Sequence, residues 1–319
     1  MTGLEDAALL AVVAIGSALG ASALPRASWP RRSPAAAILL WQALGLASGL
    51  AAVGTLIGLA MPDSRIGVVR SVLRAGALLG TGGVFRVPGL FGYGTGGAPT
   101  LVVAIRLACL AAGLALLALL CWVLLAASVA AVQARRRQRA LLTLLAHGDP
   151  KVPGALVVDY PSAAAYCLPG LRSQIVVSVG TLQLLGRGEL AAVLAHERAH
   201  LRERHDLVLL PFTALRRAFP RSATCTGAHR SVALLVEMLA DDRALRGGPA
   251  RELVSALVRF GTAGTCPVPA GALAAAEGEV AARVTRLLQP VRPLPALAVA
   301  SICLAAALLV AAPVTLLIV

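Results

Sequence analysis

Residues 189–200 read ELAAVLAHERAH, and this stretch places the strongest constraint on the fold. His196 and His200 are four residues apart, so on a helix their imidazoles project from one face, one turn apart. Two ring nitrogens at that spacing can bind one zinc ion at about 2.0–2.1 Å. Glu197 would lean over the open position of that ion and take a proton from its bound water. The pattern H-E-x-x-H on a helix therefore predicts a zinc hydrolase.

The sequence around this motif favours a catalytic helix over a chance match. Residues 190–195 are almost wholly apolar, so the two histidines begin where the helix enters a core. We expect this helix to begin at Gly188, with Glu189 in its first turn, and to end at Pro211. Short β-strands are expected immediately before it, as in zincins, whose substrates lie along an edge strand beside the active-site helix. The expected strands cover residues 155–159, 164–168 and 174–179.

A catalytic zinc needs a third protein ligand as well as an open position. Glu237 is the better candidate, in a second helix expected over residues 231–246, and Asp241 follows on the same face. Glu237 can bind the ion, and Asp241 can accept the N–H of a ligating histidine from the second shell of the site. Alternatively, Glu237 and Asp241 lie on a solvent-exposed face of the helix and pair with nearby arginines. His205 is the weaker ligand candidate, because it stands nine residues after His196.

Other polar residues keep open roles at this point. Asp206 either pairs with an arginine or supports the site. Tyr160, Tyr166 and His229 are the obvious donors to a developing oxyanion, and the sequence does not choose among them. The six cysteines include no C-x-x-C pair, which argues against a cysteine zinc site, and all of them are interpreted as small buried hydrophobes.

The composition is that of an integral membrane protein. Hydrophobic residues make up 58% of the 319-residue chain and charged residues 14%, whereas a soluble domain has about 25% charged residues. The apolar residues are mostly Ala and Leu, which favours helices over a membrane barrel. Four stretches are long enough to cross a bilayer. They cover residues 4–24, 35–60, 107–134 and 293–319.

The flanking arginines predict the orientation of these spans. Arg26, Arg31 and Arg32 lie between the first two spans, and Arg135 begins a basic run after the third. The positive-inside rule makes both segments cytoplasmic, so both termini lie outside in a multi-pass protein of a bacterial-type inner membrane. The loop over residues 61–100 is then extracellular, although its arginines also allow an interfacial helix or a re-entrant segment.

Residues 135–292 hold all five histidines and most of the charged residues, so they form the water-facing domain. About 155 residues suffice for one hydrophobic core. The sequence therefore predicts a mainly α membrane protein with an N-terminal membrane domain over residues 1–134. A cytoplasmic α+β zinc protease domain follows over 135–292, and a C-terminal transmembrane helix over 293–319. The net charge of +14 reflects arginines beside apolar runs, and with only 3% aromatic residues we expect no direct nucleic-acid binding.

Several motifs in this domain also match a known family. They are Tyr166-Cys-Leu-Pro-Gly170, Gln174-Ile-Val-Val-Ser-Val-Gly180, Glu189 to His200, Glu237-Met-Leu-Ala-Asp241, and Arg283 with Arg286 before the last span. In combination they resemble the BlaR/MecR-type membrane metallopeptidases, which are gluzincin-like enzymes. The Ste24/HtpX-type membrane proteases share part of this pattern and are the nearest alternative.

The resemblance implies functional roles for five of these residues. His196, His200 and Glu237 would be the zinc ligands, Glu197 the general base, and Asp241 a second-shell residue. It also implies a cytoplasmic protease domain that cleaves a repressor of the BlaI/MecI type, or the protein itself, with a homodimer as a possible state. The sequence ends at Val319 without an extracellular penicillin-binding domain, which argues against β-lactam sensing. The alternatives are HtpX-like quality control of membrane proteins and a catalytically silent signalling protein.

Overall fold

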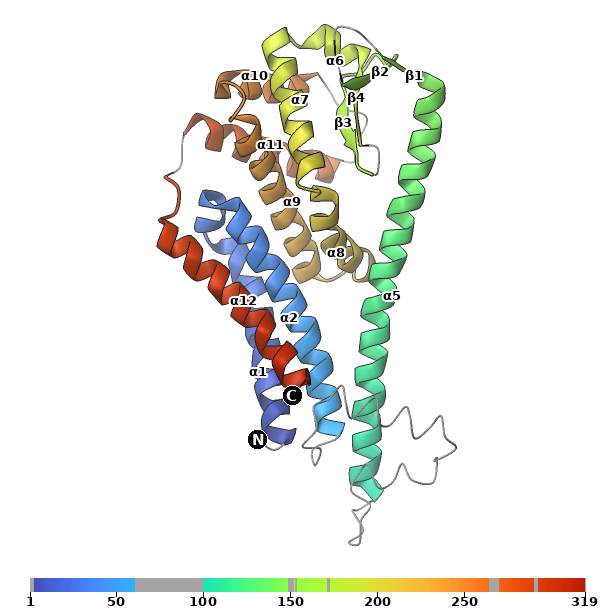
Figure 1. The fold of residues 1–319 in the computed structure, drawn as a ribbon, viewed down its shortest axis with the longest axis vertical. Helices are drawn as coiled ribbons and strands as arrows, with labels where there is room; N and C mark the ends of the chain where they lie inside the picture. The colour runs from blue at the N-terminus through green and yellow to red at the C-terminus, as the bar shows by residue number, and fades with distance from the viewer. Residues whose placement is uncertain are drawn as a thin grey trace. The chain divides into compact units, whose positions relative to one another are not determined.

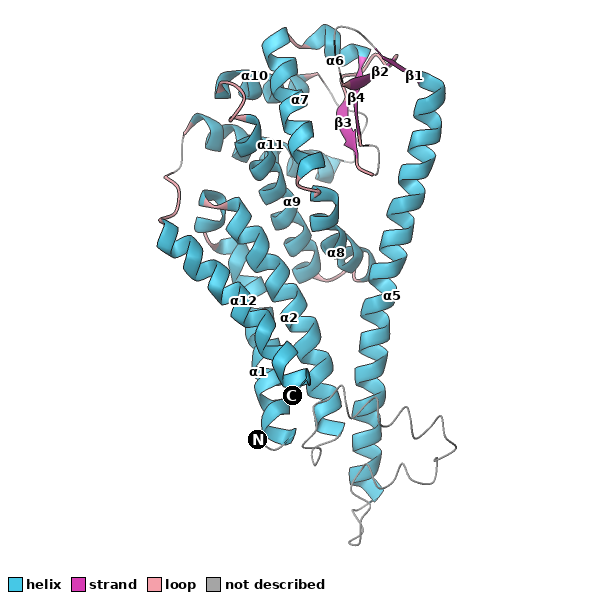
Figure 2. Cartoon of the chain, viewed as in Figure 1, coloured by secondary structure: helices cyan, strands magenta, loops and turns pink. Residues whose placement is uncertain are grey.

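Figure 1 shows a computed structural model of the chain. It describes residues 3–60, 100–148, 152, 154–170, 173–263, 270–289 and 292–318. The described part is mainly helical with one small sheet, as Figure 2 shows, which confirms the expected fold class in outline. The predicted outer loop lies outside the described residues except for its last residue, Thr100.

Four helices are long and apolar enough to cross a membrane, so the chain is a multi-pass membrane protein. They are α1 (Gly3–Ala23), α2 (Pro34–Ala60), α5 (Thr100–Leu145) and α12 (Ala296–Ile318). Three of them agree with the predicted spans within a few residues. At 46 residues, α5 is much longer than predicted. Its apolar run continues into an arginine-rich stretch of good helix formers, so nothing in the sequence ends the helix at the membrane boundary.

The chain divides into two compact units. One contains α1, α2, α12 and the first half of α5. The other contains the rest of α5, the sheet, the helices that follow it, and the short segment Ser28–Ala35 between α1 and α2. The histidine motif lies in this second unit, which is called the peptidase unit below.

The sheet of the peptidase unit has four short strands in the order β1-β2-β4-β3. The strands are β1 (Ala146–Gly148), β2 (Ala155–Val158), β3 (Ala165–Leu168) and β4 (Gln174–Ser178). β2 and β4 are parallel, and the two outer pairs are antiparallel. Three strands match the prediction within a residue. β1 was not predicted, because three residues after a long helix carry no alternating pattern.

Alternating side chains of β4 give the sheet two apolar faces. Ile175 and Val177 pack in a core cluster with Leu194 of the active-site helix. Val176 points to the other face, where it packs with Leu142 at the end of α5. The sheet is therefore held between α5 and the helix that carries the histidine motif.

The helices after the sheet are α6 (Val179–Leu184), α7 (Arg187–Arg202), α8 (His205–Ala218), α9 (Ala223–Ala244), α10 (Ala250–Thr262) and α11 (Ala270–Leu288). The predicted end of the active-site helix at Pro211 is wrong. α7 ends nine residues earlier, because Arg204 adopts a left-handed backbone with φ 50° and interrupts the helix. Pro211 lies inside α8, where it removes one main-chain hydrogen bond. α9 also begins earlier than predicted, because Ser222 caps it.

Glu189 fixes the first turn of α7. One carboxylate oxygen accepts the Gly186 N–H at 2.7 Å, which is half of a capping box, since glycine offers no side chain in return. The other oxygen accepts a hydrogen bond from the Ser255 hydroxyl of α10 and lies 3.1 Å from Nε of Arg259. The Ser255 and Gly186 hydrogen bonds hold the pKa of buried Glu189 below its ordinary value of 4.5. This carboxylate therefore joins α7 to α10.

Glu189→Gln should lower the melting temperature at neutral pH by several degrees. Hydrogen bonds to a buried charge contribute about 1.5–3 kcal/mol to stability. Each kcal/mol of lost stability lowers the melting temperature by about 2–4 °C. A lowered pKa contributes stability above the unfolded value of 4.5, and this contribution is lost as the pH falls. The difference in melting temperature between wild type and the variant should thus become smaller below about pH 4.5. The matched control is Glu252→Gln in the first turn of α10, where the side chain is 29% exposed. Equal effects of the two substitutions would contradict this role of Glu189.

Candidate metal centre

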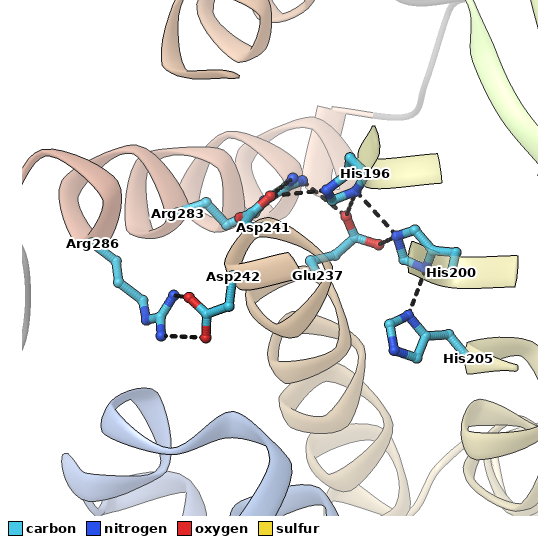
Figure 3. Close-up of polar contacts among 8 residues, drawn as sticks. All are labelled: His196, His200, His205, Glu237, Asp241, Asp242, Arg283 and Arg286. Carbon is cyan, nitrogen blue, oxygen red and sulfur yellow. Dashed lines mark hydrogen bonds and ion pairs between the residues drawn. The ribbon is translucent and has the colours of Figure 1, made fainter. Parts of the chain in front are cut away.

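Three side chains from two helices converge in the peptidase unit, as Figure 3 shows. His196 and His200 come from α7, and Glu237 comes from α9. The two Nε2 atoms lie 3.1 Å apart. The Glu237 carboxylate places Oε2 3.3 Å from Nε2 of His196 and Oε1 3.5 Å from Nε2 of His200. All three ligand atoms lie within 4.8 Å of one another, so this group could hold one metal ion.

The spacing of these atoms suits zinc. Two nitrogens bound tetrahedrally at about 2.0–2.1 Å should lie about 3.3 Å apart, close to the 3.1 Å observed between the imidazoles. Burial would raise the pKa of Glu237, but its contacts with His196 and Arg283 lower the value to about 2. The third donor is therefore an ionised carboxylate, which zinc binds readily.

Asp241 lies behind His196 and is 1% exposed. Its Oδ1 is 3.0 Å from Nδ1 of His196, although the ring N–H is not aimed along this contact. Arg283 of α11 donates two hydrogen bonds to the Asp241 carboxylate, at 2.8 and 2.6 Å, and places a third nitrogen 2.9 Å from Oε2 of Glu237. Burial would raise the pKa of Asp241, but Arg283 and His196 keep it below its ordinary value. The ion pair of Asp241 and Arg283 thus contacts two of the proposed ligands, His196 and Glu237.

His205 lies behind His200 and outside the ligand cluster. Its Nδ1 is 2.9 Å from Nδ1 of His200, and its Nε2 is 3.3 Å from a Glu203 carboxylate oxygen. When Nε2 of His200 is free to bind a metal, its Nδ1 carries the proton and can donate it to His205. The sequence missed this supporting role, because the break between α7 and α8 at Arg204 is what turns His205 towards His200.

Glu197 is partly buried beside the cluster, and burial raises the pKa of its carboxyl to about 7. Its neighbour across the helix–sheet boundary is Cys167 of β3. Burial and the nearby Glu197 raise the pKa of this thiol to about 12, so it stays protonated beside the carboxyl group. The interpretation of Cys167 as only a small hydrophobe missed this contact, which follows from the position of β3 beside α7.

The other polar residues considered from the sequence are not part of the ligand cluster. Asp206 pairs with Arg135 of α5 at 2.9 Å, which settles its role as an ion pair between α8 and α5. Tyr166 packs with the cluster on the α5 face of the sheet. Tyr160 lies after β2 with its side chain 42% exposed. His229 is partly buried in α9, in the field of Arg216. The structure gives no contact that selects one of the last three as an oxyanion donor among the described residues.

Residues 130–219 match the family model described as Peptidase family M48. The matched segment runs from the polar end of α5 to the end of α8, so it includes both histidines of the cluster but not Glu237. No curated protein and no solved structure matches the chain. The match to an M48 model over residues 130–219 and the His–His–Glu cluster together confirm the predicted zinc metallopeptidase. They do not single out the BlaR/MecR subtype.

The purified chain should bind about one zinc ion, and loss of a supporting contact should weaken that binding. Asp241→Asn and His205→Gln should each lower the zinc affinity about 10–100-fold, since such partners orient the ligating imidazoles. Competition with a chelator, followed by metal analysis, measures the affinity. The matched control is His229→Gln, which should leave it unchanged. A wild-type chain that takes up no zinc, or supporting variants that bind it as tightly as wild type, would count against the site.

Proposed function

We propose that this chain is a zinc endopeptidase in which His196, His200 and Glu237 hold the metal and Glu197 is the general base. The observation that carries the proposal is the convergence of the three ligand atoms within 4.8 Å, with a carboxylate of raised pKa beside them. A bound zinc ion would supply Lewis-acid chemistry and lower the pKa of a coordinated water to about 7. The Glu197 carboxylate then accepts a proton from the attacking water and returns it to the leaving amine.

The sheet supports a protein substrate bound in extended form. β3 is an outer strand that pairs only with β4 among the described strands, and it packs against α7. An extended peptide can add to such an edge through main-chain hydrogen bonds. Because Cys167 of β3 contacts Glu197, a peptide along β3 would pass the general base.

Two features support cleavage at a membrane surface. α5 continues without a break from an uncharged span into the polar residues that precede β1, so no linker separates span and domain. The segment between α1 and α2 belongs to the peptidase unit. Arg286 of α11 donates a hydrogen bond to the Arg31 carbonyl at 2.8 Å. Arg32 donates one to the Arg292 carbonyl at 3.0 Å. The arginine-rich loop and the peptidase unit thus share one side of the membrane, which the positive-inside rule makes cytoplasmic.

Glu197→Gln should reduce cleavage of a substrate about 10²–10⁴-fold while zinc content and melting temperature stay close to those of wild type, because only the proton acceptor is lost. A casein or reporter-peptide assay on the full chain in lipid nanodiscs measures the rate. The control is Glu252→Gln, which should cleave normally. Proteolysis that is undiminished in the Glu197 variant would rule out this mechanism.

We further propose that the substrate is a single regulator, as the resemblance to the BlaR/MecR-type enzymes suggests. Terminal labelling of proteins from cells that express wild type or the Glu197→Gln variant compares their cleavage products. One or a few cleaved proteins, a small DNA-binding repressor among them, are expected. Cleavage of many misfolded membrane proteins would instead indicate a quality-control protease.

A further inference from the structure

A basic cavity lies beside the metal centre, on a neighbouring face of α7. It is an open cavity of about 620 Å³ between α7 and the end of α9. Successive turns of α7 place residues 195, 198, 199 and 202 on this face and the two histidines on another. Its lining consists of Ala195, Arg198, Ala199, Arg202, Glu203, Arg243, Arg246 and Gly247. None of these residues is a metal ligand, and only Glu203 touches the supporting contacts of the metal centre, through His205.

The cavity carries an excess of positive charge. Four of its lining residues are arginines, and Glu203 is its one acidic residue. Glu203 is already engaged, because its carboxylate pairs with Arg243 and contacts His205. The side chains of Arg198, Arg202 and Arg246 are exposed, and within the described part of the chain they form no hydrogen bond or ion pair. Three guanidinium groups at the cavity therefore meet no anion among the described residues and are open to a ligand from solution.

Ordinary helix stabilisation accounts for three of the four arginines but not for Arg198. Arginines at the ends of α7 and α9 complement the partial negative charge of a helix C-terminus, which explains Arg202, Arg243 and Arg246. Arg198 is in the interior of α7, and it stands four residues before Arg202, a spacing at which like charges destabilise a helix. The repulsion is relieved if an anion binds between the two helices.

We propose that this cavity is a binding site for a phosphate-bearing ligand, either a soluble phosphate ester or the headgroup of an anionic lipid. Guanidinium forks match the oxygens of a phosphate and donate paired, charge-assisted hydrogen bonds to them. The volume falls within the 300–1,000 Å³ usual for small-molecule sites, which leaves room for an organic group beside the phosphate.

A ligand held in this cavity joins the two helices that carry the metal ligands. Arg198 and Arg202 belong to α7 with His196 and His200, and Arg243 belongs to α9 with Glu237. Binding to the folded state alone stabilises that state by mass action. Occupancy therefore strengthens the packing of α7 on α9 and links the level of an anion to the stability of the peptidase unit.

The test uses the full chain in phosphatidylcholine nanodiscs, with glycerol 3-phosphate as the probe at constant ionic strength. The melting temperature of the wild-type protein should rise with the concentration of glycerol 3-phosphate and then reach a plateau. The double variant Arg198→Gln/Arg202→Gln should need at least ten times more probe for the half-maximal rise, while Arg217→Gln on the exposed surface of α8 should respond as wild type does. Equal zinc content in all three proteins verifies that they are folded. Because the readout is thermal, it is independent of the proposed peptidase activity.

A second arm distinguishes the two sources of phosphate. If nanodiscs that contain phosphatidylglycerol raise the melting temperature of wild type and abolish its response to the probe, the ligand is a lipid headgroup. If the response persists, it is a soluble phosphate ester. The proposal is overturned by no saturable rise, by equal responses of the double variant and Arg217→Gln, or by succinate acting at the same concentration, which would indicate a surface for acidic peptides.

Discussion

Asp241 is a buried carboxylate held between His196 of α7 and Arg283 of α11, and the rest of the site depends on this contact. A buried charge is costly unless it is paired and hydrogen-bonded, so removal of either partner would leave the other uncompensated. Arg283 also reaches Glu237, one turn before Asp241 on α9. The three helices are therefore locked together at the point where the two ligating helices meet, and a second contact, from His205 to His200, fixes the other imidazole.

The next residue along α9 extends this arrangement towards the membrane-spanning part of the sequence. Asp242 accepts two hydrogen bonds from Arg286, one turn after Arg283 on α11, and Arg286 in turn donates to the carbonyl of Arg31 between α1 and α2. Adjacent acids on one helix thus pair with arginines three residues apart on another. One pair supports the metal ligands, and the other holds the segment between α1 and α2.

Features that depend on neighbouring residues could be predicted from the sequence. The i, i+4 spacing of His196 and His200 and the apolar run before them predict a metal-binding helix, and the long uncharged stretches predict four spans. Contacts set by the tertiary structure could not be predicted. The left-handed turn at Arg204 replaces the expected helix end at Pro211 and brings His205 behind His200, and no residue pattern marks that turn. Likewise, Cys167 meets Glu197 only because β3 is the sheet edge beside α7.

The central claim is that two imidazoles of α7 and one carboxylate of α9 bind a single zinc ion. X-ray absorption at the zinc edge of the purified, zinc-loaded chain tests this most directly, because it reports the donor atoms and their distances. Two histidine nitrogens and one or two oxygens are expected at about 2.0–2.2 Å, with no sulfur. The signal of one histidine should be lost in His200→Ala. A zinc–sulfur distance of about 2.3 Å, which would bring in Cys167, or a shell of oxygens without imidazole would contradict the account.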